Sequence, residues 1–453
     1  MNNNSKQIAD FLRIDRDLVE NINYVYSDGV ATIEVTLSAR SHSCPKCGSL
    51  NAISKGLRGK KMRHCLFMGR KTDIILLRRR LHCKDCGASF TPEDTFSPKF
   101  SKTTYETEAQ AVEMLMEYNA TYTSVGKALG ISATSVISIF DRLVNPKRKK
   151  LPEILSIDEC YGDGQFTEPY ALILMDWREK TVVDVLEGRD KRTISSYLFN
   201  QTTEEERSGV AFVVGDMWEP YRDLAKRYFV KAKYVVDSFH VMENLCRALS
   251  RVRCRAQGRY GTDSLEYHFL KSSAKLLFRD DLDQLGKRHK DKKSGRWVNQ
   301  WEIVREATKS DEDLAYAREY YLSYKLFNSA KAKSLESALD RIDRFRSDAR
   351  AARIPELRAF MTTLSDWREE IGLSFVAYEG KRRISNGPME GQNSQFSKLM
   401  RVANGVKNFS RFRARLMLCY NKDCAFSPLK KGAEPRKKVG KKRGKYRKKR
   451  EGE

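Results

Sequence analysis

Two aspartates follow apolar stretches that are typical of buried strands. Asp158 ends the stretch LPEILSID, and Asp216 follows the stretch that begins at Val210. Open α/β sheets bind their ligands outside the carboxyl ends of the strands, which is where both side chains are expected. Three predicted strands are followed by a strand–helix–strand unit. In a ribonuclease-H-like sheet of that order the first and fourth strands are neighbours, so Asp158 and Asp216 should lie side by side.

A third carboxylate would turn this pair into a metal site. Two carboxylates at short distance repel, and both stay ionised when a cation lies between them. Oxygen ligands suit Mg²⁺ or Mn²⁺. A third acid would allow two ions, which together promote phosphoryl transfer. We predict Glu390 for this position, in the first turn of a helix that starts near Pro388 and that Asn386 can cap. Each acid alone is more simply explained as a solvated surface carboxylate, so the prediction depends on the set.

Two CxxC pairs near the N-terminus indicate a second kind of metal site. Each pair is followed by a glycine, and 35 residues separate the pairs. Two such knuckles form a closed, structural zinc site of four thiolates. A redox pair is the alternative, but it needs only one CxxC. The predicted ligands are Cys44, Cys47, Cys83 and Cys86. Four nearby residues leave open a substitution of one ligand: His42, His64, Cys65 and His82.

The elements that position these residues begin with a helical segment, residues 105–145. Val125 and Leu129 mark one helix, Gly130 lies in a turn, and Ser132 begins a second helix. This is the pattern of a helix-turn-helix, and a plain helical hairpin is the alternative. Four residues of the second helix are predicted to face a DNA groove: Ala133, Thr134, Ser135 and Ser138.

The charge of the chain favours a polyanionic partner. Its 453 residues carry a formal net charge of +26, with a pI of about 9.6. Nucleic acid is the leading candidate, and a basic but unoccupied surface is the alternative. No apolar run approaches the roughly 20 residues of a membrane helix, and the N-terminus does not resemble a signal peptide. We therefore expect a soluble, cytoplasmic, nucleoid-associated protein without a membrane partner.

The chain is expected to be a multidomain α/β protein. The core strands should be interrupted by an all-helical insertion, and a basic tail should be disordered. The predicted domains are 1–40, an N-terminal helix (residues 8–21) and a strand-like alternating segment (residues 24–37); 41–100, zinc-binding; 101–148, helix-turn-helix; 149–254, the first part of the ribonuclease-H-like core; 255–380, the helical insertion; 381–425, the last core helices; and 426–453, the tail.

Several stretches together resemble the DDE transposases of bacterial insertion sequences, most closely the ISL-three family. They are the doubled CxxC, the helix-turn-helix, LSIDE, VVGDMWEPY, VVDSFHV and SNGPMEGQNSQFSKLMRVANGVKNFSRFRAR, and they cover nearly the whole chain. The resemblance places the catalytic triad on Asp158, Asp216 and Glu390, which would bind two Mg²⁺ or Mn²⁺ ions. Asp237 and His240 match an Asp-x-x-His pattern of several transposase groups and are expected to support the site. A helix cap and a packed histidine are the alternative.

The resemblance implies binding to terminal inverted repeats, cleavage of the DNA ends and joining of the 3′-hydroxyls to target DNA. Because two ends must be held together, a homodimer or higher oligomer is expected. A DNA-binding regulator derived from a transposase and a structure-selective nuclease of the same fold are the alternatives. Further DNA contacts are predicted from the basic linker and from basic residues of the last stretch quoted above: Lys147, Arg148, Lys149, Arg401, Lys407, Arg411 and Arg413.

Overall fold

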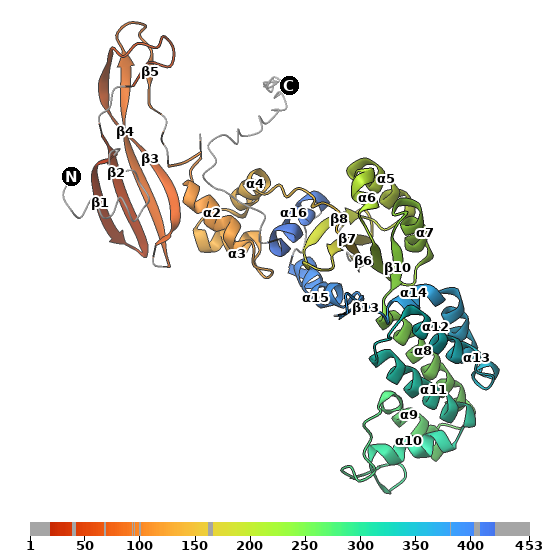
Figure 1. Ribbon diagram of the computed structural model, residues 1–453. Helices are drawn as coiled ribbons and strands as arrows, with labels where there is room; N and C mark the ends of the chain where they lie inside the picture. The colour runs from red at the N-terminus through yellow and green to blue at the C-terminus, as the bar shows by residue number, and fades with distance from the viewer. Residues whose placement is uncertain are drawn as a thin grey trace, which may run out of the picture. The chain divides into compact units, whose positions relative to one another are not determined.

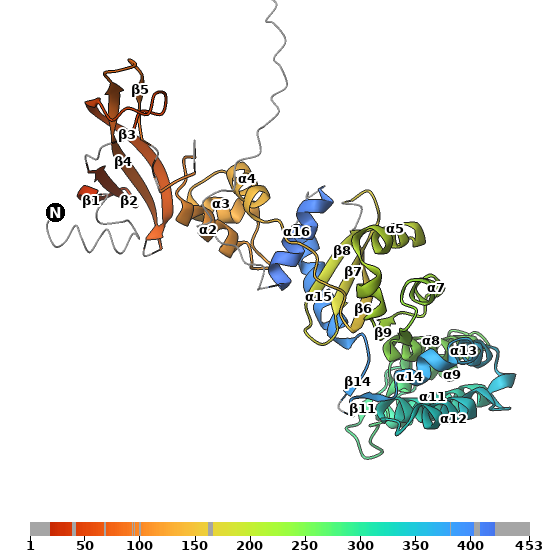
Figure 2. The same ribbon diagram turned by 45° about the horizontal axis from the view of Figure 1, so that its top comes forward.

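The computed structural model describes residues 19–38, 42–67, 69–92, 94, 96–98, 101–161, 166–380, 382–402 and 408–421. The chain divides into two compact units, Met1–Pro146 with Ala414–Glu453, and Lys147–Arg413, and Figures 1 and 2 show the elements of each. No single helix in the described ranges is long and apolar enough to cross a membrane. One bent helix pair, Tyr122–Leu129 with Ala133–Leu143, has the length and composition of a broken membrane span. Its apolar residues are buried in the core of the first unit. The predicted tail lies outside the described residues.

The first unit contains a five-stranded sheet in the order β1-β2-β4-β3, with β5 paired to β4. Its strands are β1 Val19–Ser27, β2 Val30–Leu37, β3 Ala52–Phe67, β4 Arg70–Cys83 and β5 Ser89–Phe90. The helix predicted over residues 8–21 lies largely outside the described residues, and its last three residues belong to β1. The single alternating segment predicted over residues 24–37 is instead a hairpin, because Asp28 and Gly29 both adopt positive φ and form a tight turn.

Three helices follow the sheet: α2 Tyr105–Met114, α3 Tyr122–Leu129 and α4 Ala133–Leu143. Gly130 ends α3 with φ 69°, and the Ser132 side chain accepts a hydrogen bond from Ser135 N at the start of α4. The predicted turn and cap are therefore confirmed. The two helices meet at 108°. Gly126 permits this close turn, since an added Cβ would lie 2.7 Å from the carbonyl oxygen of Ile131.

The second unit is built on a sheet in the order β10-β9-β6-β7-β8. Its strands are β6 Ile154–Tyr161, β7 Tyr170–Asp176, β8 Val182–Glu187, β9 Phe212–Gly215 and β10 Lys233–Val236. β7 is antiparallel to β6 and β8, whereas β9 runs parallel to β6 and β10. The predicted contact between the first and fourth strands is confirmed. The prediction that the first strand ends at Asp158 was wrong: pairing with β7 carries β6 on to Tyr161.

Helices cover this sheet and extend beyond it. Core residues of β6 and β7 pack with buried residues of α5, α7 and α8, while Ile154 and Val214 pack with Ile384. After α8 comes a helical region, the segment predicted as an insertion (Figure 1). The chain then returns to the sheet through α15, which packs on β6 (Figure 2). The helices are α5 Lys191–Gln201, α6 Glu204–Ser208, α7 Glu219–Tyr228, α8 Ser238–Gln257, α9 Leu265–Ser272, α10 Gln300–Lys309, α11 Glu312–Ser329, α12 Leu335–Arg346, α13 Pro355–Asp366, α14 Arg368–Leu373, α15 Gly387–Val402 and α16 Phe409–Tyr420.

Candidate functional site

Asp158 and Asp216 are brought together by the parallel pairing of β6 and β9. The register aligns Ser156 with Val214, and each aspartate follows two residues later along its strand direction. Gly215 makes room for the turn into Asp216, because an added Cβ would lie 2.7 Å from the hydroxyl of Tyr234. Burial, with repulsion from Asp216, raises the pKa of Asp158 to about 6. That raised pKa reflects a site in which negative charges lie close together.

His240 contacts the second of these acids from the first turns of α8. Its Nε2 atom lies 2.7 Å from Asp216 Oδ1. The hydrogen bond to Asp216 raises the pKa of His240 to about 9, against the opposing effect of burial. Asp237 precedes α8, and its side chain accepts a hydrogen bond from Phe239 N as the N-cap. Asp237 is also 2% exposed, so a carboxylate is buried beside the imidazolium.

Glu390 reaches the same place from α15. Ligand atoms of Asp237, His240 and Glu390 all lie within 4.8 Å of one another. Burial and the neighbouring Asp237 carboxylate together raise the pKa of Glu390 to about 7. Asp216 contacts His240 of this group at 2.7 Å, and Asp158 interacts electrostatically with Asp216 and Glu390. The five predicted residues therefore lie near one another, although neither Asp158 nor Asp216 belongs to the group within ligand distance. The sequence did not indicate that Glu390 would lie beside Asp237.

Two asparagines complete the polar lining, and the sequence had not identified either as a site residue. Asn393 donates from Nδ2 to Asp158 Oδ2 at 2.5 Å. Asn386 donates from Nδ2 to Ile157 O at 3.3 Å, so its side chain bonds to β6 and does not cap α15 as predicted. The sequence contained one indication that Asn393 belongs to the site. It follows Glu390 by three residues, which places both side chains on the same face of a helix.

The donor set fits a divalent cation. Three of the buried oxygens at or beside this site have no hydrogen-bond partner among the described residues: Asp237 Oδ2, Asn386 Oδ1 and Asn393 Oδ1. Buried acceptors without donors are costly unless a cation or water satisfies them. Carboxylate and amide oxygens are the ligands that Mg²⁺ and Mn²⁺ prefer. The lining therefore suits a hard cation better than an uncharged ligand.

A further acid on β6, Glu159, is bound by other side chains of the protein. Tyr221 donates from its hydroxyl to Glu159 Oε1 at 2.6 Å, and Arg189 forms a salt bridge with the same carboxylate. The Arg189 guanidinium stacks over the rings of Tyr170 and Trp218 at 4.0 and 5.1 Å. This network fixes the segment after Asp216 onto β6. It leaves Glu159 paired with a guanidinium.

The four predicted zinc ligands form one cluster in the first unit. Cys44 Sγ lies 3.5 Å from Cys86 Sγ, and Cys47 Sγ lies 3.6 Å from Cys83 Sγ. All four sulfurs are within 4.8 Å of one another. The two knuckles repeat the same backbone pattern, since Gly48 N donates to Cys44 O and Gly87 N to Cys83 O. Four thiolates around one point are the ligand set of a closed, structural zinc ion.

Three of the four residues that left the ligand set open contact other side chains: His64, Cys65 and His82. His64 Nδ1 lies 2.9 Å from Thr104 Oγ1 and its Nε2 lies 3.2 Å from Cys65 Sγ. Burial lowers the pKa of His64 to about 4, so this ring is neutral. His82 Nδ1 lies 3.1 Å from Ser89 Oγ. None of these residues belongs to the four-sulfur cluster.

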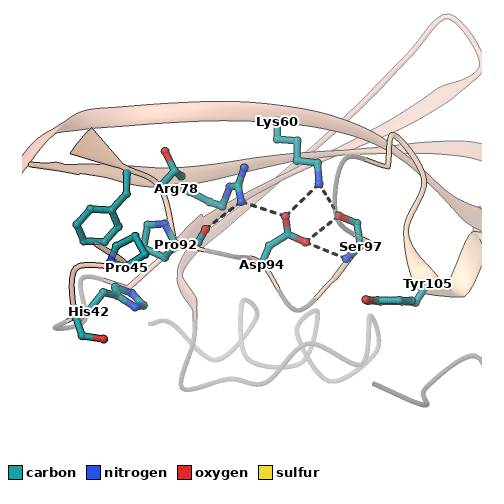
Figure 3. Close-up of a pocket in the computed structure, with 11 residues that line it drawn as sticks. His42, Pro45, Lys60, Arg78, Pro92, Asp94, Ser97 and Tyr105 are labelled. Atoms are coloured by element: carbon teal, nitrogen blue, oxygen red, sulfur yellow. Dashed lines mark hydrogen bonds and ion pairs between the residues drawn. The ribbon is translucent and has the colours of Figure 1, made fainter. Parts of the chain in front are cut away.

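His42 lines an open cavity of about 770 Å³ beside the knuckles (Figure 3). Two of its basic side chains share one acid, because Lys60 and Arg78 both contact Asp94 Oδ2, at 3.1 and 3.2 Å. Asp94 Oδ1 also accepts from Ser97. The cavity is therefore held by an internal ion-pair network, and its cations are already paired.

The residues predicted to contact DNA differ in their exposure and in whether they are already paired. Arg148 is paired with Glu206 at 2.8 Å and Arg413 with Asp184 at 2.5 Å, so both guanidinium groups stabilise the second unit. Lys147, Arg401 and the α4 residues Thr134 and Ser138 are exposed. The others are half-buried, namely Ala133, Ser135, Lys149 and Arg411. Lys407 lies outside the described residues.

Comparisons with protein families agree with this architecture. A family model of an ISL-three-type (ISL3) transposase matches residues 155–416, which include the strands of the second sheet except for Ile154, the first residue of β6. A model described as the zinc-finger of transposases IS204, IS1001, IS1096 and IS1165 matches residues 40–86, which include all four cysteines. A search of the curated proteins finds no match.

Proposed function

The chain belongs to the ISL-three family of DDE transposases, and we propose that it cleaves the ends of an insertion sequence and joins the resulting 3′-hydroxyls to target DNA. The observation that carries the proposal is that Asp158 on β6 interacts electrostatically with Asp216, just after β9, and with Glu390 on α15. The sheet order and strand directions support a ribonuclease-H-like core, interrupted between α8 and α15 by a helical insertion.

We assign Asp158, Asp216 and Glu390 as ligands of two Mg²⁺ or Mn²⁺ ions, with Asp237 beside them. When bound, the ions would activate the attacking oxygen and stabilise the leaving oxygen of an in-line phosphoryl displacement. The protein's own contribution is to hold several half-buried carboxylates close together despite their repulsion. Burial and that repulsion raise the pKa values of Asp158 and Glu390.

Two neighbours position these acids. Asn393 donates to Asp158 Oδ2, which fixes the carboxylate and leaves Oδ1 to accept from Glu159 N. His240 places a positive charge 2.7 Å from Asp216. An imidazolium at that distance compensates part of the negative charge, so the site can fold before cations arrive. We assign both residues as positioning groups.

DNA recognition is proposed to lie in the first unit and on the basic surface. The bend between α3 and α4 and the cap at Ser132 support a helix-turn-helix whose exposed Thr134 and Ser138 contact the terminal repeats. The zinc module would stabilise the strands that precede it. Because two element ends must be joined in one reaction, a homodimer or higher oligomer on DNA is proposed.

The acidic site separates this proposal from the regulator alternative. A protein that only binds DNA gains nothing from half-buried, mutually repelling carboxylates, whose cost is offset fully only when metal cations bind. A structure-selective nuclease of the same core would need the acids as well. Competition between repeat-ended and branched DNA distinguishes the two enzymes, because the nuclease has no requirement for terminal repeats.

The deciding experiment is Asp216→Asn in a strand-transfer assay with Mg²⁺ and DNA that carries the element ends. Loss of a metal ligand removes several kcal/mol of transition-state stabilisation, so joining should fall by at least about 10³-fold while end binding stays nearly intact. Asp223→Asn is the matched control, because Asp223 is exposed and pairs with Lys191 on the surface. An Asp216→Asn protein that still joins ends would overturn the assignment.

A further inference from the structure

A short basic hairpin projects from the helical region of the second unit. Its strands are β11 His289–Lys290 and β12 Trp297–Val298, and we call residues 287–297 the basic hairpin. We propose that the basic hairpin binds DNA that contains unpaired nucleotides, with its cations on phosphates and Trp297 stacked on a base. The choice of DNA over other polyanions rests on the proposed function, whereas the surface itself is argued from its geometry.

The tip of the basic hairpin is held by one aspartate. Asp291 Oδ2 accepts from the backbone N and the hydroxyl of Ser294, both at 2.7 Å. Asp291 Oδ1 lies 2.7 Å from His268 Nε2 of α9. Gly295 adopts φ 68° in the turn, and Asp291 N donates to Arg296 O at 2.8 Å. The tip is therefore ordered before any ligand binds, which reduces the entropic cost of binding.

The base of the basic hairpin is fixed to α10. Asn299 caps that helix in a reciprocal capping box with Glu302, and its Nδ2 donates to Gln284 O at 2.7 Å. Arg288 forms a salt bridge with the same Glu302 at 2.5 Å. Val298 is buried beneath the hairpin. One face of the hairpin thus packs on the helices and the other faces outward.

The outward surface carries cations that the protein does not neutralise. Six residues of the basic hairpin are Lys or Arg. Arg288 pairs with Glu302, and Lys293 pairs with Asp263. Within the described part of the chain the remaining four have no ion-pair partner: Lys287, Lys290, Lys292 and Arg296. The one acid of the segment, Asp291, is occupied in the turn. Four unpaired cations on one small element favour a polyanion.

The exposed side chain of Trp297 favours nucleic acid over other classes of polyanion. Its side chain is 61% exposed, and it is the only tryptophan among the exposed large apolar residues of the described chain. The strand register pairs Trp297 with Lys290, so an aromatic face and a cation lie side by side. An acidic protein surface or a lipid headgroup would use the cations and leave the ring unexplained. Nucleic acid offers phosphates and aromatic bases together.

The Trp297 ring also favours DNA with unpaired bases over a fully paired duplex. Bases inside a duplex are stacked on both sides and present no free face, whereas an overhang or an opened end does. Stacking of one base on an aromatic side chain is sequence-tolerant and typically changes affinity by about 5- to 150-fold. We therefore expect the contribution of Trp297 to depend on unpaired nucleotides, and the contribution of the cations to be common to both forms.

The test measures binding of the full-length protein, without divalent ions, to a blunt duplex and to the same duplex with a three-nucleotide overhang. Trp297→Ala should weaken overhang binding by about 5- to 150-fold and blunt binding by less than about 2-fold. Replacing Lys290, Lys292 and Arg296 by Gln should weaken both and lower the slope of log Kd against log salt by up to about 3. Lys226, Arg227 and Lys231, exposed on and after α7, provide the matched triple control.

Two results would overturn the proposal. Equal losses on both duplexes, or no loss, for Trp297→Ala exclude base stacking. A hairpin triple variant that binds DNA like the control triple but changes the oligomeric mass identifies the surface as an interface between copies. Because cleavage is not measured, failure here is distinguishable from failure of the proposed function, which is decided by strand transfer in Asp216→Asn.

Discussion

The Nε2 atom of His240 lies 2.7 Å from Oδ1 of Asp216, so a cation from α8 is bound to the acid that follows β9. The same site holds Asp158 and Glu390, whose pKa values are raised to about 6 and about 7. The pKa of His240 is raised to about 9. All three groups therefore favour the protonated state in the folded protein.

The metal-free protein is expected to lose stability as the pH rises from about 5 to about 9. The stability linked to Asp158 and Glu390 is complete below their unfolded pKa values, near 4, and is lost as the pH passes about 6 and 7. The stability linked to His240 is complete below its unfolded pKa of about 6.5. It is lost as the pH rises past the folded pKa of about 9. Urea midpoints from tryptophan fluorescence report this unit, because all five tryptophans of the chain belong to it.

Saturating Mn²⁺ should flatten this pH dependence, because the cations bind the ionised carboxylates and stabilise them. The metal affinity should correspondingly rise between about pH 5 and 7, with release of protons. A midpoint that increases over this range without divalent ions would show that the acids do not repel one another as the structure indicates.

Asn393→Ala should weaken metal binding by about 10- to 100-fold, as is typical for a residue that orients a ligand. Its hydrogen bond lowers the pKa of Asp158, so the loss should be larger at pH 6.5 than at pH 8. Titration with Mn²⁺ at both values measures this difference. Ser394→Ala is the control, because Ser394 is exposed on the same helix. An equal loss at both pH values would point to a packing defect instead.

Removal of zinc should unfold the cysteine module without affecting the acidic site. In small zinc modules the metal contributes roughly 10–16 kcal/mol to folding, so Cys83→Ser or a strong chelator should abolish the module's protection from proteolysis. Tryptophan fluorescence and Mn²⁺ affinity, which report the second unit, should not change. Cys254→Ser is the control, since this exposed cysteine lies outside the cluster.

Gly126→Ala should destabilise the α3–α4 pair by about 1–3 kcal/mol, because the added Cβ would lie 2.7 Å from Ile131 O. Binding to the element ends should weaken with it. Gly261→Ala adds a methyl group to open space at a position without positive φ, and should change neither property. Thermal melting and end binding of the two variants are compared directly. Normal end binding by Gly126→Ala would remove the α3–α4 pair from DNA recognition.

The sequence by itself determined what depends on neighbours along the chain. The two glycine-bearing knuckles, the Gly130 turn and the Ser132 cap follow from backbone conformations that only a few residue types adopt or stabilise. The core strands of the second unit could also be predicted, because long apolar runs between turns leave little choice. Asp216 was placed correctly after its strand for that reason.

Only the tertiary structure decided what depends on packing between distant segments. Pairing with β7 extends β6 past Asp158. The approach of α15 puts Glu390 beside Asp237 and Asn393 on Asp158, although 173 residues separate Asp216 from Glu390. The sequence predicted Arg413 as a DNA contact, but in the structure its guanidinium forms a salt bridge with Asp184. A residue type records what a side chain can bind, and the fold determines which partner lies within reach.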